Sequence, residues 1–87
     1  MIKTLLIDDE NNALKTLQSY IHKYTKDVSV VGIATSKKEA IDLIKNTKDF
    51  DLILLDINLG DGNAFEVLEQ IPSKNFHIIF TTAYDEY

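Results

Sequence analysis

Residues 51–58 read Asp-Leu-Ile-Leu-Leu-Asp-Ile-Asn, and this stretch is the strongest indication of the fold. Residues 52–55 are aliphatic without polar alternation, which is typical of a strand buried on both faces of a parallel sheet. A buried helix segment can have the same composition, but the run is short, and an aspartate before it and two glycines after it favour a strand. Asp56 is therefore predicted to lie at the carboxyl end of a central strand, where open α/β sheets place their chemistry.

A carboxylate in this position also fits a purely structural interpretation. Asp56 could accept a hydrogen bond in an Asx-turn, or it could cap the helix that follows. Taken alone, the stretch favours this structural interpretation over a functional one. The order of the surrounding elements is needed to choose between them.

Three more strands are predicted at residues 2–7, 28–34 and 77–81, because each segment is short and rich in aliphatic side chains. Together with residues 52–55 they make four strands. Helical patterns occupy each interval between them. The predicted order is therefore strand and helix in strict alternation, beginning and ending with a strand.

Three helices are predicted from apolar side chains that recur every three or four residues. The first runs from residue 11 to about 26. The second follows Ser36, whose spacing from Glu39 matches a capping box, and ends near Thr47. The third is short and stops at Pro72. The apolar faces consist of Leu14, Leu17, Ile21 and Tyr24 in the first helix, Ala40, Ile41 and Ile44 in the second, and Phe65, Leu68 and Ile71 in the third.

This alternation predicts an α/β fold, a doubly wound parallel sheet with helices on both faces. Right-handed crossovers place the carboxyl ends of all parallel strands at one edge of the sheet. Asp8, Asp9 and Asp56 each follow a predicted strand directly, as do Thr81 and Thr82. Their expected convergence at one edge favours a functional role for Asp56 over a structural one.

Three carboxylates at one edge repel one another unless a positive charge neutralises them. Mg²⁺ is the natural candidate, because it takes oxygen ligands and commonly uses one or two protein carboxylates; a carbonyl near Asn58 would add a further ligand. A carboxylate beside Mg²⁺ can act as a nucleophile toward phosphorus and form an aspartyl phosphate. The hydroxyl of Thr81 or Thr82 could donate a hydrogen bond to a phosphoryl oxygen.

Composition sets the outer limits of function. Eighty-seven residues suit a single small domain, and the net charge of −5 argues against nucleic-acid binding by this segment. The absence of cysteine excludes disulfides, thiolate catalysis and zinc–thiolate sites. No apolar stretch approaches the length of a membrane span and no signal peptide is visible, so no membrane contact and a cytoplasmic location are expected. A dinucleotide or P-loop site is disfavoured, because the loop at residues 8–12 is acidic and lacks glycine.

Residues 5–10 (Leu-Leu-Ile-Asp-Asp-Glu), 56–59 (Asp-Ile-Asn-Leu) and 82–83 (Thr-Ala) resemble the receiver domain of two-component response regulators, and the resemblance covers the whole chain. It implies a flavodoxin-like receiver fold in which Asp56 accepts a phosphoryl group from a sensor histidine kinase. It implies that Asp9, Asp56 and the backbone carbonyl of Asn58 bind Mg²⁺, with Asp8 assisting through water. It implies that Thr82 is the switch hydroxyl; Thr82 is preferred to Thr81 because an alanine follows it, as in the family.

Residues 56–65 and 81–87 further resemble receivers of the LytTR (LytR/AlgR) class. Members of that class couple the receiver to a C-terminal DNA-binding output domain, which implies a role in transcription regulation for the parent protein. The family fold continues with a fourth helix, a fifth strand that carries an essential lysine, and a fifth helix. Residues 1–87 are thus expected to be the N-terminal portion of a receiver domain, without these three elements and without an output domain. An uncovered strand at residues 77–81 would then favour self-association of the chain.

Two other functions remain open at this point. A pseudo-receiver would act as an interaction module without being phosphorylated. An aspartate-nucleophile phosphatase of the haloacid dehalogenase kind would also use a strand-end aspartate, but it requires Asp-x-Asp after an early strand, and position 58 is asparagine. On the receiver interpretation the chain assists only its own phosphorylation and dephosphorylation, and it is not expected to be a metabolic enzyme.

Overall fold

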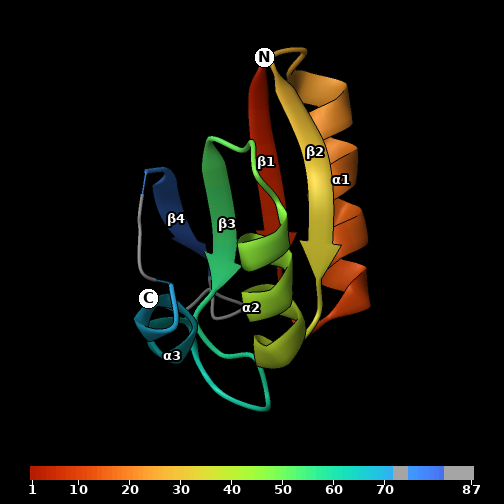
Figure 1. Ribbon diagram of the computed structural model, residues 1–87. Helices are drawn as coiled ribbons and strands as arrows, with labels where there is room; N and C mark the ends of the chain where they lie inside the picture. Colours follow the sequence, from red (N-terminus) through yellow and green to blue (C-terminus); the bar gives the residue numbers. More distant parts are fainter. Residues whose placement is uncertain (72–74, 82–87) are drawn as a thin grey trace.

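The computed structural model describes residues 1–71 and 75–81, in which strands and helices alternate as the sequence predicts (Figure 1). The strands match the predicted segments, while helix α1 ends slightly before the expected boundary near residue 26. The elements are β1 (Ile2–Ile7), α1 (Asn11–Tyr24), β2 (Val28–Ala34), α2 (Lys37–Asn46), β3 (Leu52–Asp56), α3 (Ala64–Glu69) and β4 (His77–Thr81).

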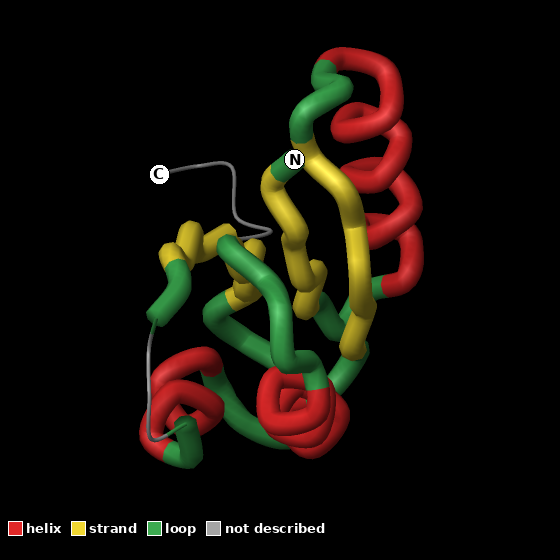
Figure 2. The backbone as a smooth tube through the Cα atoms, turned by 45° about the horizontal axis from the view of Figure 1, so that its top comes forward, coloured by secondary structure: helices red, strands yellow, loops and turns green. Residues whose placement is uncertain are grey.

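The four strands form one sheet in the order β2-β1-β3-β4, and every neighbouring pair is parallel. Helix α1 lies on one face of the sheet, and α2 and α3 lie on the other (Figures 1 and 2). This arrangement confirms the predicted doubly wound α/β fold. It also places the carboxyl ends of β1 and β3, the two central strands, side by side.

The main apolar core fills the space between the sheet and the pair α2 and α3. The predicted inward positions of α2 are confirmed, since Ala40 and Ile44 are buried and Ile41 packs against the core. The cluster consists of Leu5, Ile7, Ala34, Ala40, Ile44, Ile53, Leu55, Leu59, Ala64, Val67 and Ile71. Burial of this much aliphatic surface holds α2 and α3 firmly against the strands that carry the acidic residues.

Burial of β3 differs from the prediction that both of its faces are covered. Ile53 and Leu55 are fully buried against α2 and α3, but Leu52 and Leu54 are only partly buried. Side chains alternate along a strand, so this second pair faces the α1 side of the sheet. Helix α1 runs beside β2 there and leaves β3 less covered by the described part of the chain (Figure 1).

Two aromatic side chains predicted to belong to apolar helix faces are exposed instead. Tyr24 closes α1 and is 70% exposed, with its ring 6.0 Å from that of Tyr20. Phe65 is 57% exposed and packs its ring 5.6 Å from Phe80. The buried residues of α3 are Ala64 and Val67, which are three residues apart and therefore lie on the same side of a helix. Of the other residues predicted for this face, Leu68 packs against the core and Ile71, just beyond the helix, is buried in it.

Strand β4 forms one edge of the described sheet. Its Ile79 is 53% exposed, and Phe80 is also exposed apart from its contact with Phe65. Unpaired edges with apolar side chains are prone to pair with a second chain, so self-association stays a prediction. Within residues 1–71 and 75–81, no helix combines the length and apolar character needed to cross a bilayer.

Candidate functional site

The register between β1 and β3 brings the sequence-predicted acidic residues together. Ile7 lies opposite Leu55 in the parallel ladder, so the next residue of each strand segment, Asp8 and Asp56, emerges at the same edge. The N–H of Asp8 also donates to the carbonyl of Ala34 at 3.1 Å, which holds the end of β1 against β2. The convergence expected from topology is therefore present.

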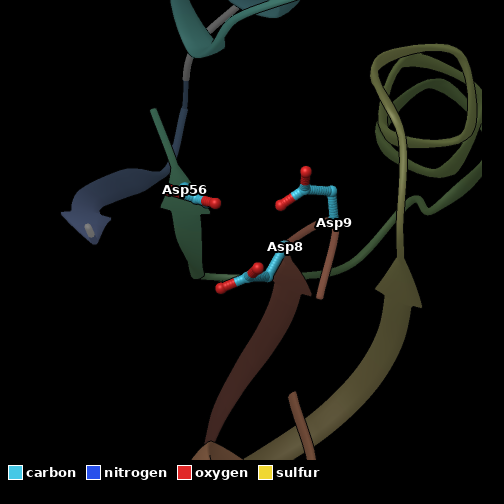
Figure 3. A group of neighbouring side chains, drawn as sticks. All are labelled: Asp8, Asp9 and Asp56. Atoms are coloured by element: carbon cyan, nitrogen blue, oxygen red, sulfur yellow. The ribbon is translucent and has the colours of Figure 1, made fainter. Parts of the chain in front are cut away.

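One carboxylate oxygen from each of Asp8, Asp9 and Asp56 lies within 4.8 Å of the other two (Figure 3). Asp56 is only 6% exposed, Asp8 is half-buried and Asp9 is exposed. The cluster is thus buried at Asp56 and open to solvent at Asp9. A ligand can reach Asp56 from the side on which Asp9 stands.

The electrostatics of the cluster are unfavourable in the absence of a cation. Burial, followed by the nearby charge of Asp8 and a smaller contribution from Asp9, raises the pKa of Asp56 from 3.8 to about 6. The nearby N–H groups of Asn58 and Ile57 oppose this increase. In the described residues the ion pairs are Lys3 with Asp49 and Lys37 with Glu66, so neither neutralises the three aspartates.

The acidic residues also have local structural contacts. Asp8 Oδ1 accepts the N–H of Glu10 at 2.9 Å at the start of α1. The N–H of Asn58, two residues further along, acts to lower the pKa of Asp56, which is the pairing expected of an Asx-turn. Asp56 does not cap the next helix, because Asn63 is the N-cap of α3. The structural and functional interpretations of Asp56 are therefore compatible with each other.

Residues 57–63, here called the acceptor loop, connect Asp56 to α3. The N–H of Ala64 donates to the carbonyl of Ile57 at 2.8 Å, which closes the loop at its base. Gly60 adopts a positive φ of 81°, a conformation that glycine accepts without steric cost. Asn58 Oδ1 accepts the N–H of Gly60 at 3.2 Å, while none of the described residues donates to the Asn58 carbonyl. That carbonyl is therefore available as a ligand.

A carboxylate that the sequence did not single out, Asp61, joins the acceptor loop to α2. Its Oδ1 accepts the N–H of Lys37 at 2.7 Å, and its Oδ2 accepts the N–H of Lys38 at 3.3 Å. No sequence signal links Asp61 to these residues, because they lie more than twenty positions earlier and belong to another element. Their proximity depends on the packing of α2 beside α3.

Two helix caps refine the sequence prediction. Ser36 caps α2 as expected, but the Glu39 carboxylate bonds to the N–H and hydroxyl of Thr35 rather than to the backbone of Ser36. The complete capping box belongs to α3, where Asn63 and Glu66 bond reciprocally. The spacing of a capping residue and a glutamate three positions later was a readable signal for this second box.

Of the two threonines expected near the site, the structure describes one. Thr81 belongs to β4 and lies opposite Asp56 in the parallel ladder, as predicted for a strand residue. Thr82 lies outside the described residues, as does Ala83. The assignment of the switch hydroxyl to Thr82 therefore stays a prediction.

The donor set fits a hard divalent cation. All three side-chain donors are carboxylate oxygens, one is buried, and the group carries negative charge without a cationic partner in the described part of the chain. Mg²⁺ favours such ligands, completes its shell with water, and would offset the repulsion that raises the pKa of Asp56. Asp8, Asp9, Asp56 and the Asn58 carbonyl are the groups available to hold it.

Comparison with known proteins supports the interpretation that the site suggests. The sensory transduction protein LytT of Bacillus anthracis is 38% identical over 89 residues, which cover all of this chain and 35% of LytT. The transcriptional regulatory protein BtsR of Escherichia coli K12 is 31% identical over 88 residues, which cover all of this chain and 36% of BtsR. The chain thus spans about a third of the length of these curated relatives. The LytT match confirms the resemblance to the LytTR class.

The fold is also that of solved receiver structures. The MaeR response regulator bound to beryllium trifluoride superposes with a TM-score of 0.83 at 24% identity, over 99% of this chain and 70% of MaeR. Residues 4–87 match the response regulator receiver domain. The chain therefore belongs to the receiver domain family of two-component response regulators.

Proposed function

We propose that this chain accepts a phosphoryl group from a sensor histidine kinase onto Asp56, in the presence of Mg²⁺. The observation that carries the proposal is the cluster of Asp8, Asp9 and Asp56, whose carboxylate oxygens lie within 4.8 Å of one another. Its most buried member has a raised pKa because of that burial and the neighbouring charges. Such a cluster suits a site that binds a cation and then a phosphoryl group.

The proposed roles follow the positions of the groups. Asp9, Asp56 and the Asn58 carbonyl hold Mg²⁺ directly, and Asp8 acts through water. When bound, the ion neutralises negative charge on the carboxylates and on the incoming phosphoryl oxygens. The exposure of Asp9 lets a donor approach, while the nearby N–H groups of Asn58 and Ile57 favour the ionised carboxylate of Asp56.

In the transfer step, a carboxylate oxygen of Asp56 forms a bond to phosphorus. The bond from phosphorus to the donor's histidine nitrogen breaks, and that nitrogen leaves with the electron pair. Thr82 is proposed to donate its hydroxyl hydrogen bond to the transferred group. The chain thus assists its own phosphorylation, and we do not assign it a metabolic reaction.

The phosphoryl group adds about −1.5 to −2 charges at the sheet edge, enough to bias a two-state equilibrium. In the parent protein the proposed reader is a C-terminal DNA-binding output domain that regulates transcription in the cytoplasm. The names of LytT and BtsR, a sensory transduction protein and a transcriptional regulatory protein, support this proposal. The acidic segment itself is not proposed to contact DNA, since its net charge is −5.

Intact mass after incubation with acetyl phosphate and Mg²⁺ tests the proposal. The whole protein that carries this sequence is expected to gain one labile phosphoryl adduct, and Asp56→Asn is expected to gain none. Asp42→Asn is the matched control, because Asp42 is an exposed aspartate on α2 away from the cluster. The absence of an adduct in the wild type would favour the pseudo-receiver. Steady turnover of a generic phosphate ester that is lost in Asp56→Ala would favour the phosphatase.

A further inference from the structure

The side chain of Asp61 attaches the acceptor loop to the start of α2 by hydrogen bonds. The carboxylate accepts two hydrogen bonds, from the N–H groups of Lys37 at 2.7 Å and Lys38 at 3.3 Å. These are first-turn N–H groups, which have no partner inside their own helix and which favour a negative charge nearby. The bond from Lys37 is the main reason that the pKa of Asp61 lies below its usual value.

The side chain of Lys37 makes a second connection, from α2 to the end of the acceptor loop and the start of α3. Its ammonium lies 3.8 Å from a carboxylate oxygen of Glu66, the residue that completes the capping box of α3. Its aliphatic part lies over Gly62, where an added Cβ would collide with it. The backbone of Lys37 thus holds the middle of the acceptor loop, and its side chain covers the end of the loop.

Hydrogen bonds inside the loop lead from Asp61 back toward the metal ligands. The N–H of Asp61 donates to the carbonyl of Leu59 at 2.9 Å, and the N–H of Gly60 donates to Asn58 Oδ1 at 3.2 Å. Gly60 also lies beside the cluster, since a Cβ placed on it would be 3.5 Å from Oδ2 of Asp9. A shift of Asp61 would therefore displace residues 58–60 relative to Asp9.

We propose that Asp61 is a positioning residue for the metal site. By fixing the acceptor loop to the first turn of α2, it holds the Asn58 carbonyl in place beside Asp9 and Asp56. The inference rests on the proposed function, because it concerns how the Mg²⁺ ligands are arranged. It adds that the N-terminus of α2, which carries no metal ligand, contributes to the affinity of the site.

A purely structural role for Asp61 makes a different prediction. If the carboxylate only caps α2, its loss lowers the stability of the fold but leaves the Mg²⁺ dissociation constant unchanged once the protein is folded. If its negative charge alone attracts the cation, any neutral substitution weakens binding equally. A positioning role instead predicts that Mg²⁺ affinity depends on the hydrogen bonds between residue 61 and α2. A neutral side chain that keeps the Lys37 contact should then retain part of the affinity.

The test compares Asp61→Ala and Asp61→Asn in the whole protein, with Asp42→Ala as the control on the exposed side of α2. The Mg²⁺ dissociation constant is measured by NMR titration under conditions where each variant is folded. Asp61→Ala is expected to raise it about tenfold, the lower range for groups that orient metal ligands. Asp61→Asn keeps Oδ1 as an acceptor and is expected to give a smaller increase, and Asp42→Ala none.

Two further readouts make the result decisive. Amide hydrogen exchange at Lys37 and Lys38 is expected to accelerate in Asp61→Ala, while the phosphorylation rate with acetyl phosphate recovers at saturating Mg²⁺. If Asp61→Ala does not fold, Asp61→Ser replaces it, because the shorter side chain does not span both N–H groups.

The inference would be overturned, with the proposed function intact, if the wild type and Asp61→Ala had equal Mg²⁺ dissociation constants. Equal increases for the alanine and asparagine variants would have the same consequence. A wild type that neither binds Mg²⁺ nor gains an adduct would overturn the proposed function, and this inference with it.

Discussion

Aspartates gather at both ends of the two central strands, but their charges are balanced differently. At the amino end, Asp49 forms an ion pair with the Lys3 ammonium, and Asp51 Oδ2 accepts the N–H of Lys3 at 2.9 Å. At the carboxyl end, Asp8, Asp9 and Asp56 lie within 4.8 Å of one another, and no ion pair of the described residues reaches them. At the amino end the Lys3 ammonium offsets part of the negative charge, whereas the described residues provide no cationic partner for the cluster at the carboxyl end.

The pKa shifts show the same contrast. Lys3 has a raised pKa because it is hydrogen-bonded to Asp49, so its charged form is favoured in the fold. Asp56 has a raised pKa because burial and the charge of Asp8 disfavour its ionised form. The amino end of the sheet thus has an ion pair that links β1 to the segment before β3, whereas the carboxyl end carries an electrostatic penalty. Three measurements test this contrast.

We expect Mg²⁺ to change the stability of the fold more than the other two conditions do. A ligand present at 100 times its dissociation constant raises the free energy of unfolding by about 2.7 kcal/mol. Asp9→Asn removes a ligand and is expected to weaken binding at least about tenfold, which reduces that gain to about 1.4 kcal/mol or less. Urea denaturation with and without Mg²⁺ measures both values. Lys3→Met is the control from the opposite end and should keep the full gain; an equal gain in Asp9→Asn would contradict the contrast.

A smaller effect is expected from pH in the absence of Mg²⁺. Because the pKa of Asp56 is raised in the fold from 3.8 to about 6, the native state holds this proton more tightly than the unfolded chain. Stability contributed by the protonated form is therefore present at low pH and is lost as pH rises through this window. A pKa difference of one corresponds to about 1.4 kcal/mol, so the full increase in the pKa of Asp56 corresponds to about 3 kcal/mol. Screening at the open side of the cluster reduces the expected loss to about 1–2 kcal/mol.

The matched variant for the pH effect is Asp56→Asn, which has no carboxyl group to titrate. Urea denaturation at a series of pH values should show the wild type losing stability relative to this variant between about pH 4 and pH 6. Parallel curves for the two proteins would mean that Asp56 titrates normally. The carboxyl end of the sheet would then carry no electrostatic penalty.

The smallest effect is expected at the amino end. Lys3→Met removes the exposed ion pair with Asp49 but leaves the backbone bond from residue 3 to Asp51. Exposed ion pairs contribute little to stability and are screened by salt. The unfolding midpoint should therefore fall only slightly at low ionic strength and match the wild type at high ionic strength. A large loss that persists in high salt would show that Lys3 stabilises the fold by more than this exposed ion pair.

Much of the fold could be predicted from the sequence because the signals are local. Aliphatic runs at residues 2–7, 28–34 and 77–81 mark strands, and alternation with helices fixes their parallel direction. The meeting of Asp8 with Asp56 then follows from topology alone, since both residues directly follow strand segments that pair side by side. The cluster could therefore be predicted without knowledge of side-chain packing.

Other features depend on distances that no local pattern encodes. The contact of Asp61 with the N–H groups of Lys37 and Lys38 exists because α2 packs next to α3. The partial exposure of Leu54 depends on where α1 crosses the sheet, and the aliphatic run gave no indication of it. Phe65 was assigned to the apolar face of α3 by its hydrophobicity, although Ala64 and Val67 form the buried face.

The register of β1 against β3 also determines when the candidate centre can exist during synthesis of the chain. Asp8 is made 48 residues before Asp56 (56 − 8), and at about 5–20 residues per second this interval is roughly 2–10 s. A nascent chain that ends within this interval carries the first two carboxylates without the third. A metal ion that contacts all three aspartates would therefore bind only after β3 has been made and has paired with β1.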